Sequence, residues 1–145
     1  MATYNKFNAF VENQLISNLD WNADTFKVML CNTAPVATNS VKADLTEISA
    51  GNGYTAGGTA TTITHSRSSG TSKIVGTDVV FTASGGSIGP FRYAILVDKT
   101  VNLMIGYWDY GSSITLNGTN GDTFAVDLDG VNGVLTLATE SKRAA

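Results

Sequence analysis

The feature that most limits the fold of this chain is the even spacing of turn residues through its second half. From residue 59 onward, clusters of Gly, Asn, Asp and Ser separate short segments that suit β-strands, whose starts recur at roughly 8–12 residues. This spacing is typical of an antiparallel sandwich or barrel, and no long helical pattern interrupts it as a parallel sheet would require. We expect strands at residues 59–65, 73–75, 79–82, 91–98, 103–109, 114–116, 123–128 and 134–138.

Residues 25–31 follow a two-residue period earlier in the chain. Phe26, Val28 and Leu30 fall on one face of this expected strand, and the intervening residues fall on the other. With this segment the strand count reaches about nine, which fits an antiparallel β-sandwich of jelly-roll-like type. We therefore predict a mainly β fold.

Residues 4–19 form the one segment with a convincing helical pattern. Apolar side chains recur there at three- and four-residue steps, which gives a single apolar stripe. Thr3 is placed to act as the N-cap. We expect this amphipathic helix to dock on its own sheet, and packing on a partner is the alternative. The stripe consists of Tyr4, Phe7, Phe10, Val11, Leu15 and Leu19.

The length of 145 residues fits one domain. Within it we expect a helix and turn over residues 1–20, a β-sandwich over residues 21–140 and a flexible tail at residues 141–145. Residues 50–58 are too rich in glycine for regular structure. They permit tight turns and close backbone approach.

The charge of the chain argues against several classes of partner. The net charge is −3, only 14% of residues are charged, and the nine Lys and Arg residues form no basic cluster. Nucleic-acid binding and electrostatic membrane attachment both need such a cluster, so we expect neither. Cys31 is the only cysteine, and we expect it to act as a small buried apolar residue. The first residues lack a secretory signal pattern, so we expect synthesis in a reducing cytoplasm.

No pattern in the sequence points to catalysis, a cofactor or a metal. Asp127-Leu128-Asp129-Gly130 resembles part of a calcium loop but lacks its other ligands, so we expect a strand end and a turn. His65 is the only histidine, and the glycine-rich residues 85–90 lack the Lys-Ser/Thr ending of a phosphate loop. No two carboxylates stand out as an acid–base pair among Asp44, Glu47, Asp98, Asp109, Asp122, Asp127, Asp129 and Glu140.

The aromatic residues are the best candidates for contact with a partner. Neighbouring strand residues point to opposite faces, so Tyr107 and Trp108 must lie on opposite sides of the sheet, and one of them points away from the core or into a second contact. Exposed aromatic rings would serve as stacking platforms for carbohydrate, whereas core and edge packing is the favoured interpretation. The candidate partner-interface residues are Trp21, Tyr54, Trp108 and Tyr110.

Several short segments, spread over most of the chain, together form a known pattern. They are residues 2–7 (ATYNKF), 26–30 (FKVML), 47–58 (EISAGNGYTAGG), 91–96 (FRYAIL) and 106–111 (GYWDYG). With these segments the chain resembles small virion structural proteins of tailed bacteriophages, some of which resemble capsid cement, or decoration, proteins with a jelly-roll-like fold. The pattern contains no site motif, so no functional residue is carried over.

The resemblance implies a non-enzymatic protein that binds the major capsid protein on the outer surface of the phage head and stabilises it. It also implies a homo-oligomer that is made in the host cytoplasm and located in the virion. Three alternatives stay open: a tail or fibre component, a carbohydrate-binding module for host attachment, and a glycan hydrolase.

Overall fold

The computed structural model describes residues 2–138, and within them the chain is mainly β with antiparallel strands and one α-helix near the N-terminus. The expected mainly β, sandwich-like architecture is confirmed. The predicted tail and the last two residues predicted for the sandwich lie outside the described residues. The elements are β1 (Thr3–Lys6), α1 (Asn8–Leu15), β2 (Phe26–Cys31), the 3-10 helix η1 (Lys42–Asp44), β3 (Thr59–Thr61), β4 (Ile63–Ser68), β5 (Thr71–Gly76), β6 (Val79–Thr82), β7 (Ile88–Asp98), β8 (Leu103–Leu116), β9 (Thr123–Val126) and β10 (Leu135–Ala138).

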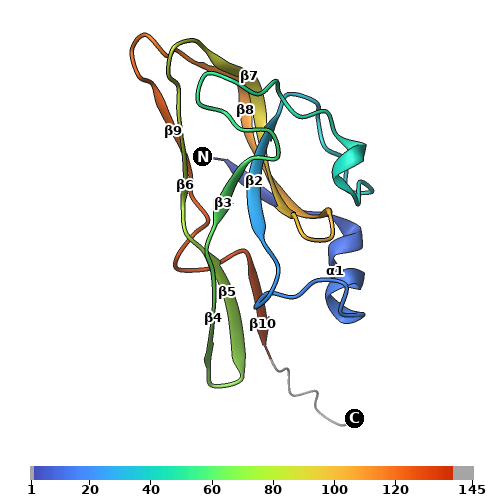
Figure 1. The fold of residues 1–145 in the computed structure, drawn as a ribbon. Coiled ribbons are helices and arrows are strands. Elements are labelled where there is room, and N and C mark those ends of the chain that lie inside the picture. Colours follow the sequence, from blue (N-terminus) through green and yellow to red (C-terminus); the bar gives the residue numbers. More distant parts are fainter. Residues whose placement is uncertain (1, 139–145) are drawn as a thin grey trace, which may run out of the picture.

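The larger layer is a five-stranded antiparallel sheet in the order β1-β8-β7-β2-β3 (Figure 1). The long β7–β8 hairpin forms its centre, and segments from the first third of the chain pair with both sides of this hairpin. β1 pairs with β8 through Tyr4 opposite Trp108, and β2 pairs with β7 through Leu30 opposite Ala94. The sheet therefore depends on contacts between residues far apart in the sequence, which no local pattern specifies.

The second layer consists of the three-stranded sheet β10-β5-β4 and the two-stranded sheet β6-β9. One continuous segment, residues 59–68, connects the layers because β3 pairs with β2 and β4 pairs with β5. At the change of sheet, Thr61 Oγ1 donates a 2.6 Å hydrogen bond to the Thr77 carbonyl, and the Thr77 N–H donates to the Thr62 carbonyl. These hydrogen bonds close one side of the sandwich.

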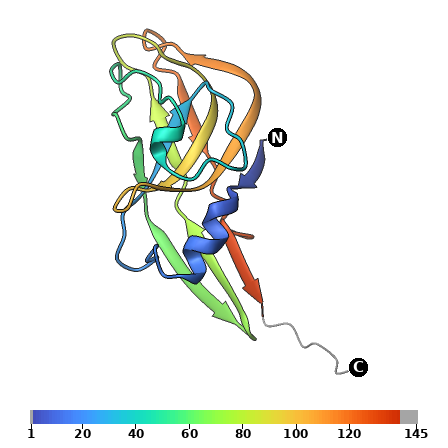
Figure 2. The same ribbon diagram turned by 90° about the vertical axis from the view of Figure 1, so that its right-hand side faces the viewer.

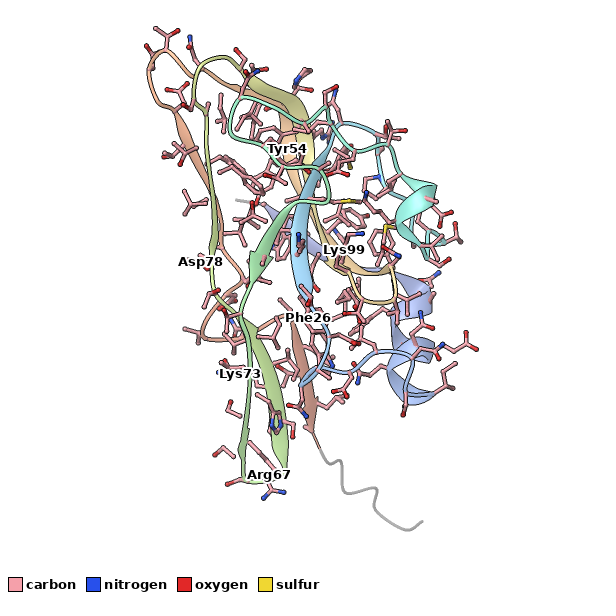
Figure 3. All side chains as sticks on the ribbon, viewed as in Figure 1. Phe26, Tyr54, Arg67, Lys73, Asp78 and Lys99 are labelled. Atoms are coloured by element: carbon pink, nitrogen blue, oxygen red, sulfur yellow. The ribbon has the colours of Figure 1, made fainter. Side chains whose placement is uncertain are left out.

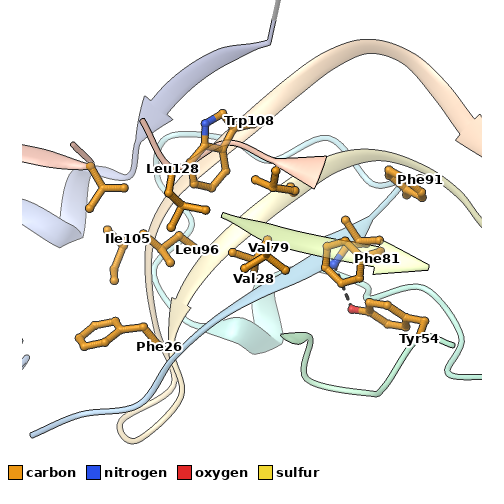
Figure 4. Close-up of a cluster of buried hydrophobic side chains, with 14 of the residues drawn as sticks. Phe26, Val28, Tyr54, Val79, Phe81, Phe91, Leu96, Ile105, Trp108 and Leu128 are labelled. Atoms are coloured by element: carbon orange, nitrogen blue, oxygen red, sulfur yellow. Dashed lines mark hydrogen bonds between the residues drawn. The ribbon is translucent and has the colours of Figure 1, made fainter. Parts of the chain in front are cut away.

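The five-stranded sheet buries apolar side chains on both faces. On the face toward the second layer, Val28 and Leu96 pack with Val79 and Phe81 in the larger core cluster (Figure 4). On the opposite face, the buried side chains of the smaller cluster come from β2, β7 and β8 together with segments that lie over them. These are Phe7, Met29, Cys31, Leu45, Tyr93, Ile95, Val97 and Met104.

The outer face of the sheet is covered by the segments around α1 and η1 (Figure 2). Phe7 directly precedes α1, and Leu45 directly follows η1. Burial on both faces explains why the central strands contain nearly continuous apolar runs rather than strict alternation. Cys31 is fully buried in this cluster, as its sequence context indicated.

The predicted helix over residues 4–19 is wrong at both ends. Residues 3–6 form strand β1, and α1 spans only Asn8–Leu15. The N-cap position is Phe7, without a side-chain cap, so Thr3 has no capping role. Residues 3–6 form a strand because their backbone groups pair with the edge of β8, and the helical periodicity of the sequence does not reveal this pairing. The helix ends before Ser17, whose φ of 60° lies in the left-handed region.

Two other predicted boundaries also differ from the structure. The segments predicted as separate strands at residues 103–109 and 114–116 form the single strand β8. Residues 110–112, where we expect a turn, belong to the segment 110–113 that lies opposite Arg92 alone and forms an irregularity inside the ladder, with Gly111 at φ 83°. Conversely, residues 59–65 divide into β3 and β4 where the chain changes sheets.

Among the described helices, none has the length and apolar character needed to cross a bilayer.

Candidate functional site

The first candidate surface lies on the side of the molecule that carries α1. Only Phe10 of this helix is buried, whereas Leu15 is 79% exposed and its neighbours Val11 and Ile16 are also exposed. The predicted apolar stripe is therefore split: Phe7, Phe10 and Leu19 serve the core, and its remaining aliphatic side chains face outward. Single exposed apolar residues are common on protein surfaces, whereas several exposed aliphatic side chains on one helix form an apolar patch.

Two neighbouring segments extend this apolar surface. The Asn8 N–H donates a 2.9 Å hydrogen bond to the Ala37 carbonyl, which places exposed Val36 beside the start of α1. The Lys42 N–H donates to the Asn102 carbonyl, which joins the segment before η1 to the β7–β8 loop. We call this surface the helix-side face. It consists of Val11, Leu15, Ile16, Val36, Val41 and Val101.

The second candidate surface is a cavity of about 300 Å³ between the edge of β8 and the segment that connects β9 to β10. We call it the aromatic pocket because three aromatic rings line it. Its volume is at the lower end of the range for small-ligand sites. The lining residues are Ala2, Tyr4, Trp108, Tyr110, Ala125, Asp127, Leu128, Asp129, Gly133 and Val134.

The rings of the aromatic pocket are fixed by their neighbours. Tyr4 lies directly across the β1–β8 ladder from Trp108, with ring centroids 4.7 Å apart. Tyr110 packs edge-to-face on Phe124 of β9, also at 4.7 Å. Trp108 is 6% exposed and packs in the core near Leu128 (Figure 4). The base of the pocket is therefore rigid and apolar.

Polar groups of the aromatic pocket differ in how well they are satisfied. The Tyr4 hydroxyl is buried and has no hydrogen-bond partner among the described residues. Burial raises the pKa of Tyr4, and burial together with the Asp127 charge raises the pKa of Tyr110. Both phenols are therefore neutral donors at physiological pH.

The two carboxylates of the aromatic pocket also shape its loop. Asp127 Oδ1 accepts a 2.7 Å hydrogen bond from the Asp129 N–H. Asp129 accepts hydrogen bonds from the backbone N–H groups of Val131 and Asn132 and from the Asn132 amide, and the hydrogen bonds from Asn132 hold its pKa below the ordinary value. Asp127 is exposed and Asp129 half-buried, so negative charge lies at the rim.

The four residues predicted as partner contacts have different positions. Trp108 and Tyr110 come together in the aromatic pocket. Tyr54 is 3% exposed and packs in the larger core cluster, so its side chain offers almost no surface in this structure. Trp21 is half-buried, stacks on Phe26 at 4.8 Å, and donates a 2.7 Å hydrogen bond to Gln14 Oε1, so it fixes the junction between helix and sheet.

The neighbours of Trp108 in β8 follow the predicted alternation. Trp108 packs in the larger cluster, and Tyr107 packs against the smaller one on the opposite face. Tyr107 makes an aromatic contact with Phe7 at 5.2 Å. Both aromatic side chains therefore serve cores, one on each side of the sheet.

Outside the two candidate surfaces, Asp109 is held by a structural partner. Arg92 makes a two-point ion pair with Asp109, at 2.8 and 3.0 Å, and the Arg92 hydrogen bond lowers the pKa of Asp109. Within residues 2–138, no three His, Cys, Asp or Glu side chains are grouped so as to hold a metal ion.

Among the basic side chains, Arg67 lies at the tip of the β4–β5 hairpin, well away from Lys99 (Figure 3).

Sequence reasoning missed some of the pocket and of the helix-side face. Tyr4 was assigned to a helix, and only the β1–β8 pairing brings it beside Trp108. Asp129 was considered as a metal ligand rather than as part of an aromatic site. Ile16, Val36 and Val101 gave no signal, since single apolar residues in loops are common.

Comparisons of the chain with protein-family models, curated proteins and solved structures gave no match.

Proposed function

We propose that this chain is a non-enzymatic virion structural protein that binds the outer surface of a phage head as a capsid decoration protein. The observation that carries the proposal is the helix-side face, an apolar surface on a sandwich whose own cores are already closed. The resemblance of residues 2–7, 26–30, 47–58, 91–96 and 106–111 to phage virion proteins indicates the partner, which is the major capsid protein.

The segments that carry the resemblance support a scaffold rather than a reaction centre. Residues 26–30 and 91–96 lie in paired central strands, and residues 106–111 continue the same sheet through β8. Residues 47–58 form the loop that holds Tyr54 in the core. A decoration protein needs such a rigid body and a contact surface, and it needs no catalytic group.

The size of the apolar surface favours many weak contacts. Full burial of a Val, Leu or Ile side chain stabilises by about 1.5–3 kcal/mol, and Val11, Leu15 and Ile16 are already partly covered. Their combined contribution is of the same order as the cost of association, which is about 4–15 kcal/mol. Firm attachment therefore depends on several linked copies, so we propose a homo-oligomer whose copies bind neighbouring capsid subunits.

Binding to particles assembled without this chain tests the proposal. The purified chain should co-sediment with such particles and saturate at a fixed number of copies. The double variant Leu15→Gln/Ile16→Gln should bind at least tenfold more weakly, since it removes apolar surface without touching the core. Leu137→Gln is the matched control, because Leu137 is an exposed leucine on β10, in the other layer.

Equal binding by the helix variant and the control would remove the helix-side face from the account. A failure of the wild-type chain to bind these particles would contradict the decoration function itself.

A further inference from the structure

We propose that the aromatic pocket binds a single neutral sugar unit, such as the terminal residue of a glycan. This inference does not depend on the decoration function, because it concerns another part of the molecule. The pocket lies between β8 and the β9–β10 connection, whereas the helix-side face surrounds α1.

The apolar part of the pocket matches one face of a pyranose ring. A sugar ring presents C–H groups on its faces and hydroxyl groups around its edge. Tyr4, Trp108 and Tyr110 offer aromatic carbon, and Leu128 and Val134 complete an apolar base. Because these side chains are held by core packing, little ordering is needed when a ligand enters.

The polar groups match the edge of the same ring. The Tyr4 hydroxyl is buried over Gly106, outside the cavity lining, and is closed to a ligand. The hydroxyl of half-buried Tyr110, which lines the cavity together with Asp127, would donate a hydrogen bond to a sugar hydroxyl. At the rim, the exposed Asp127 carboxylate would accept hydrogen bonds from further ligand hydroxyls.

The charge of the pocket selects among ligands. Asp127 and Asp129 are its only charged lining residues among those described, and both are acidic. Uronic acids, sialic acids and phosphorylated sugars would therefore be repelled. An alkylammonium group would be attracted, but Tyr4 rests against Trp108 and Tyr110 against Phe124, so the rings do not form an open box around a cation.

The size of the pocket limits the ligand to one ring. A volume of about 300 Å³ is small for a binding site, and exposed Ala125 and Asp127 lie on its rim. A glycan would insert its terminal unit, and the remainder would extend into solvent past this rim.

Nuclear magnetic resonance on the intact chain tests the inference with an internal control. The chain has two tryptophans, and Trp21 lies outside the pocket. The probes are the methyl glycosides of glucose, galactose, mannose and N-acetylglucosamine, with methyl glucuronide and tetramethylammonium as charged comparisons. At least one neutral glycoside should shift the Trp108 indole N–H saturably, in the millimolar range, and leave that of Trp21 unchanged.

Tyr110→Phe separates binding from folding. This variant keeps the ring and its edge-to-face contact with Phe124 and removes only the hydroxyl, so the melting temperature should be nearly unchanged. Affinity for the neutral glycoside should fall about three- to tenfold, which corresponds to one lost hydrogen bond. Asp127→Asn should weaken binding of the glycoside by a similar factor. Tyr107→Phe on the opposite face of β8 is the matched control and should bind normally.

Three results would overturn the inference. The first is the absence of any Trp108 shift with the neutral glycosides up to about 100 mM, where even ligands bound by only ~1–2 kcal/mol register. The second is a shift with tetramethylammonium or methyl glucuronide but with no neutral glycoside. The third is binding that Tyr110→Phe and Asp127→Asn leave unchanged.

Discussion

The Tyr54 hydroxyl donates a 2.6 Å hydrogen bond to Oε1 of Glu47, which also accepts the N–H of Gly57 at 2.6 Å. The same hydroxyl accepts the Leu30 N–H of strand β2 at 3.0 Å. Burial acts to raise the pKa of Glu47, but the hydrogen bonds from Tyr54, Lys42 and Gly57 outweigh it and lower that pKa. Through these hydrogen bonds, the Tyr54 hydroxyl links the glycine-rich loop to strand β2 of the larger sheet.

Removal of this hydroxyl should destabilise the fold. Tyr54→Phe leaves the buried Leu30 N–H without its partner, so we expect a loss of about 1–3 kcal/mol in the free energy of unfolding. Urea denaturation measures this loss. Tyr107→Phe should change stability by less than about 0.5 kcal/mol, because the structure gives that hydroxyl no hydrogen bond among the described residues. Equal losses in the two variants would contradict the role of Tyr54.

Gly58 should tolerate no side chain. Its φ is 84°, and a Cβ there would lie 2.1 Å from the Val28 carbonyl oxygen, which is backbone and cannot move aside. Gly58→Ala should therefore cost several kcal/mol, on the order of 3 or more, or prevent folding. Gly85→Ala is the matched control, with φ 77° and open space around the added Cβ. It should cost only about 1–2 kcal/mol from its backbone conformation, as thermal denaturation can measure. Similar costs at both positions would refute the close approach at Gly58.

Asp98 should make the fold more stable in mild acid. It is fully buried, and burial followed by the neighbouring Asp24 carboxyl raises its pKa to about 6. A carboxyl with a raised folded pKa binds its proton more tightly in the folded state, so its contribution to stability falls as pH rises through 4 to 6. Other carboxyls, such as Asp109, have lowered pKa values and act in the opposite direction.

Comparison with Asp98→Asn isolates this contribution. The amide can still accept the Thr100 N–H through Oδ1, which Asp98 binds at 2.9 Å. We expect the unfolding free energy of the wild type, relative to that of Asp98→Asn, to fall by on the order of 1–2 kcal/mol as the pH rises from 4 to 7. A difference that is flat, or that rises with pH, would show that Asp98 has no raised pKa.

Deletion of residues 1–20 should expose apolar surface and cause aggregation. The deletion removes β1 from the edge of β8 and takes Phe7 and Phe10 from the two cores. By contrast, Leu15→Gln/Ile16→Gln should remain monodisperse at low concentration and keep the wild-type melting temperature. Size-exclusion chromatography and thermal denaturation test both statements. A soluble and equally stable truncation would mean that this segment serves only a partner.

The sequence predicted those elements whose signal is local. Strand β6 was predicted with its observed bounds, Val79–Thr82, because a short apolar run is bounded by clear turn residues on both sides. The two faces of β2 were also predicted correctly, with Val28 in one cluster and Met29 in the other. Residues 4–6 were misassigned because Tyr4 and Phe7 satisfy a helical spacing equally well, and only the distant β8 edge decides between the two structures.

The candidate surfaces depend on the same long-range pairing. Trp108 and Tyr110 were identified from their aromatic character, but the pocket exists because β1 and the β9–β10 connection flank them. Likewise, Leu15 belongs to the predicted apolar stripe but is the last residue of α1 and is largely exposed. The periodicity of the sequence shows which face of a helix or strand is apolar, but the segments that cover this face depend on tertiary packing.

The central claim is tested most directly by the copy number of this chain relative to the major capsid protein in purified particles, measured by quantitative mass spectrometry. The decoration account predicts a ratio near one, or a simple fraction set by the symmetry of the shell. A handful of copies per particle would assign the chain to the tail or fibres, and its absence from particles would contradict a virion function altogether.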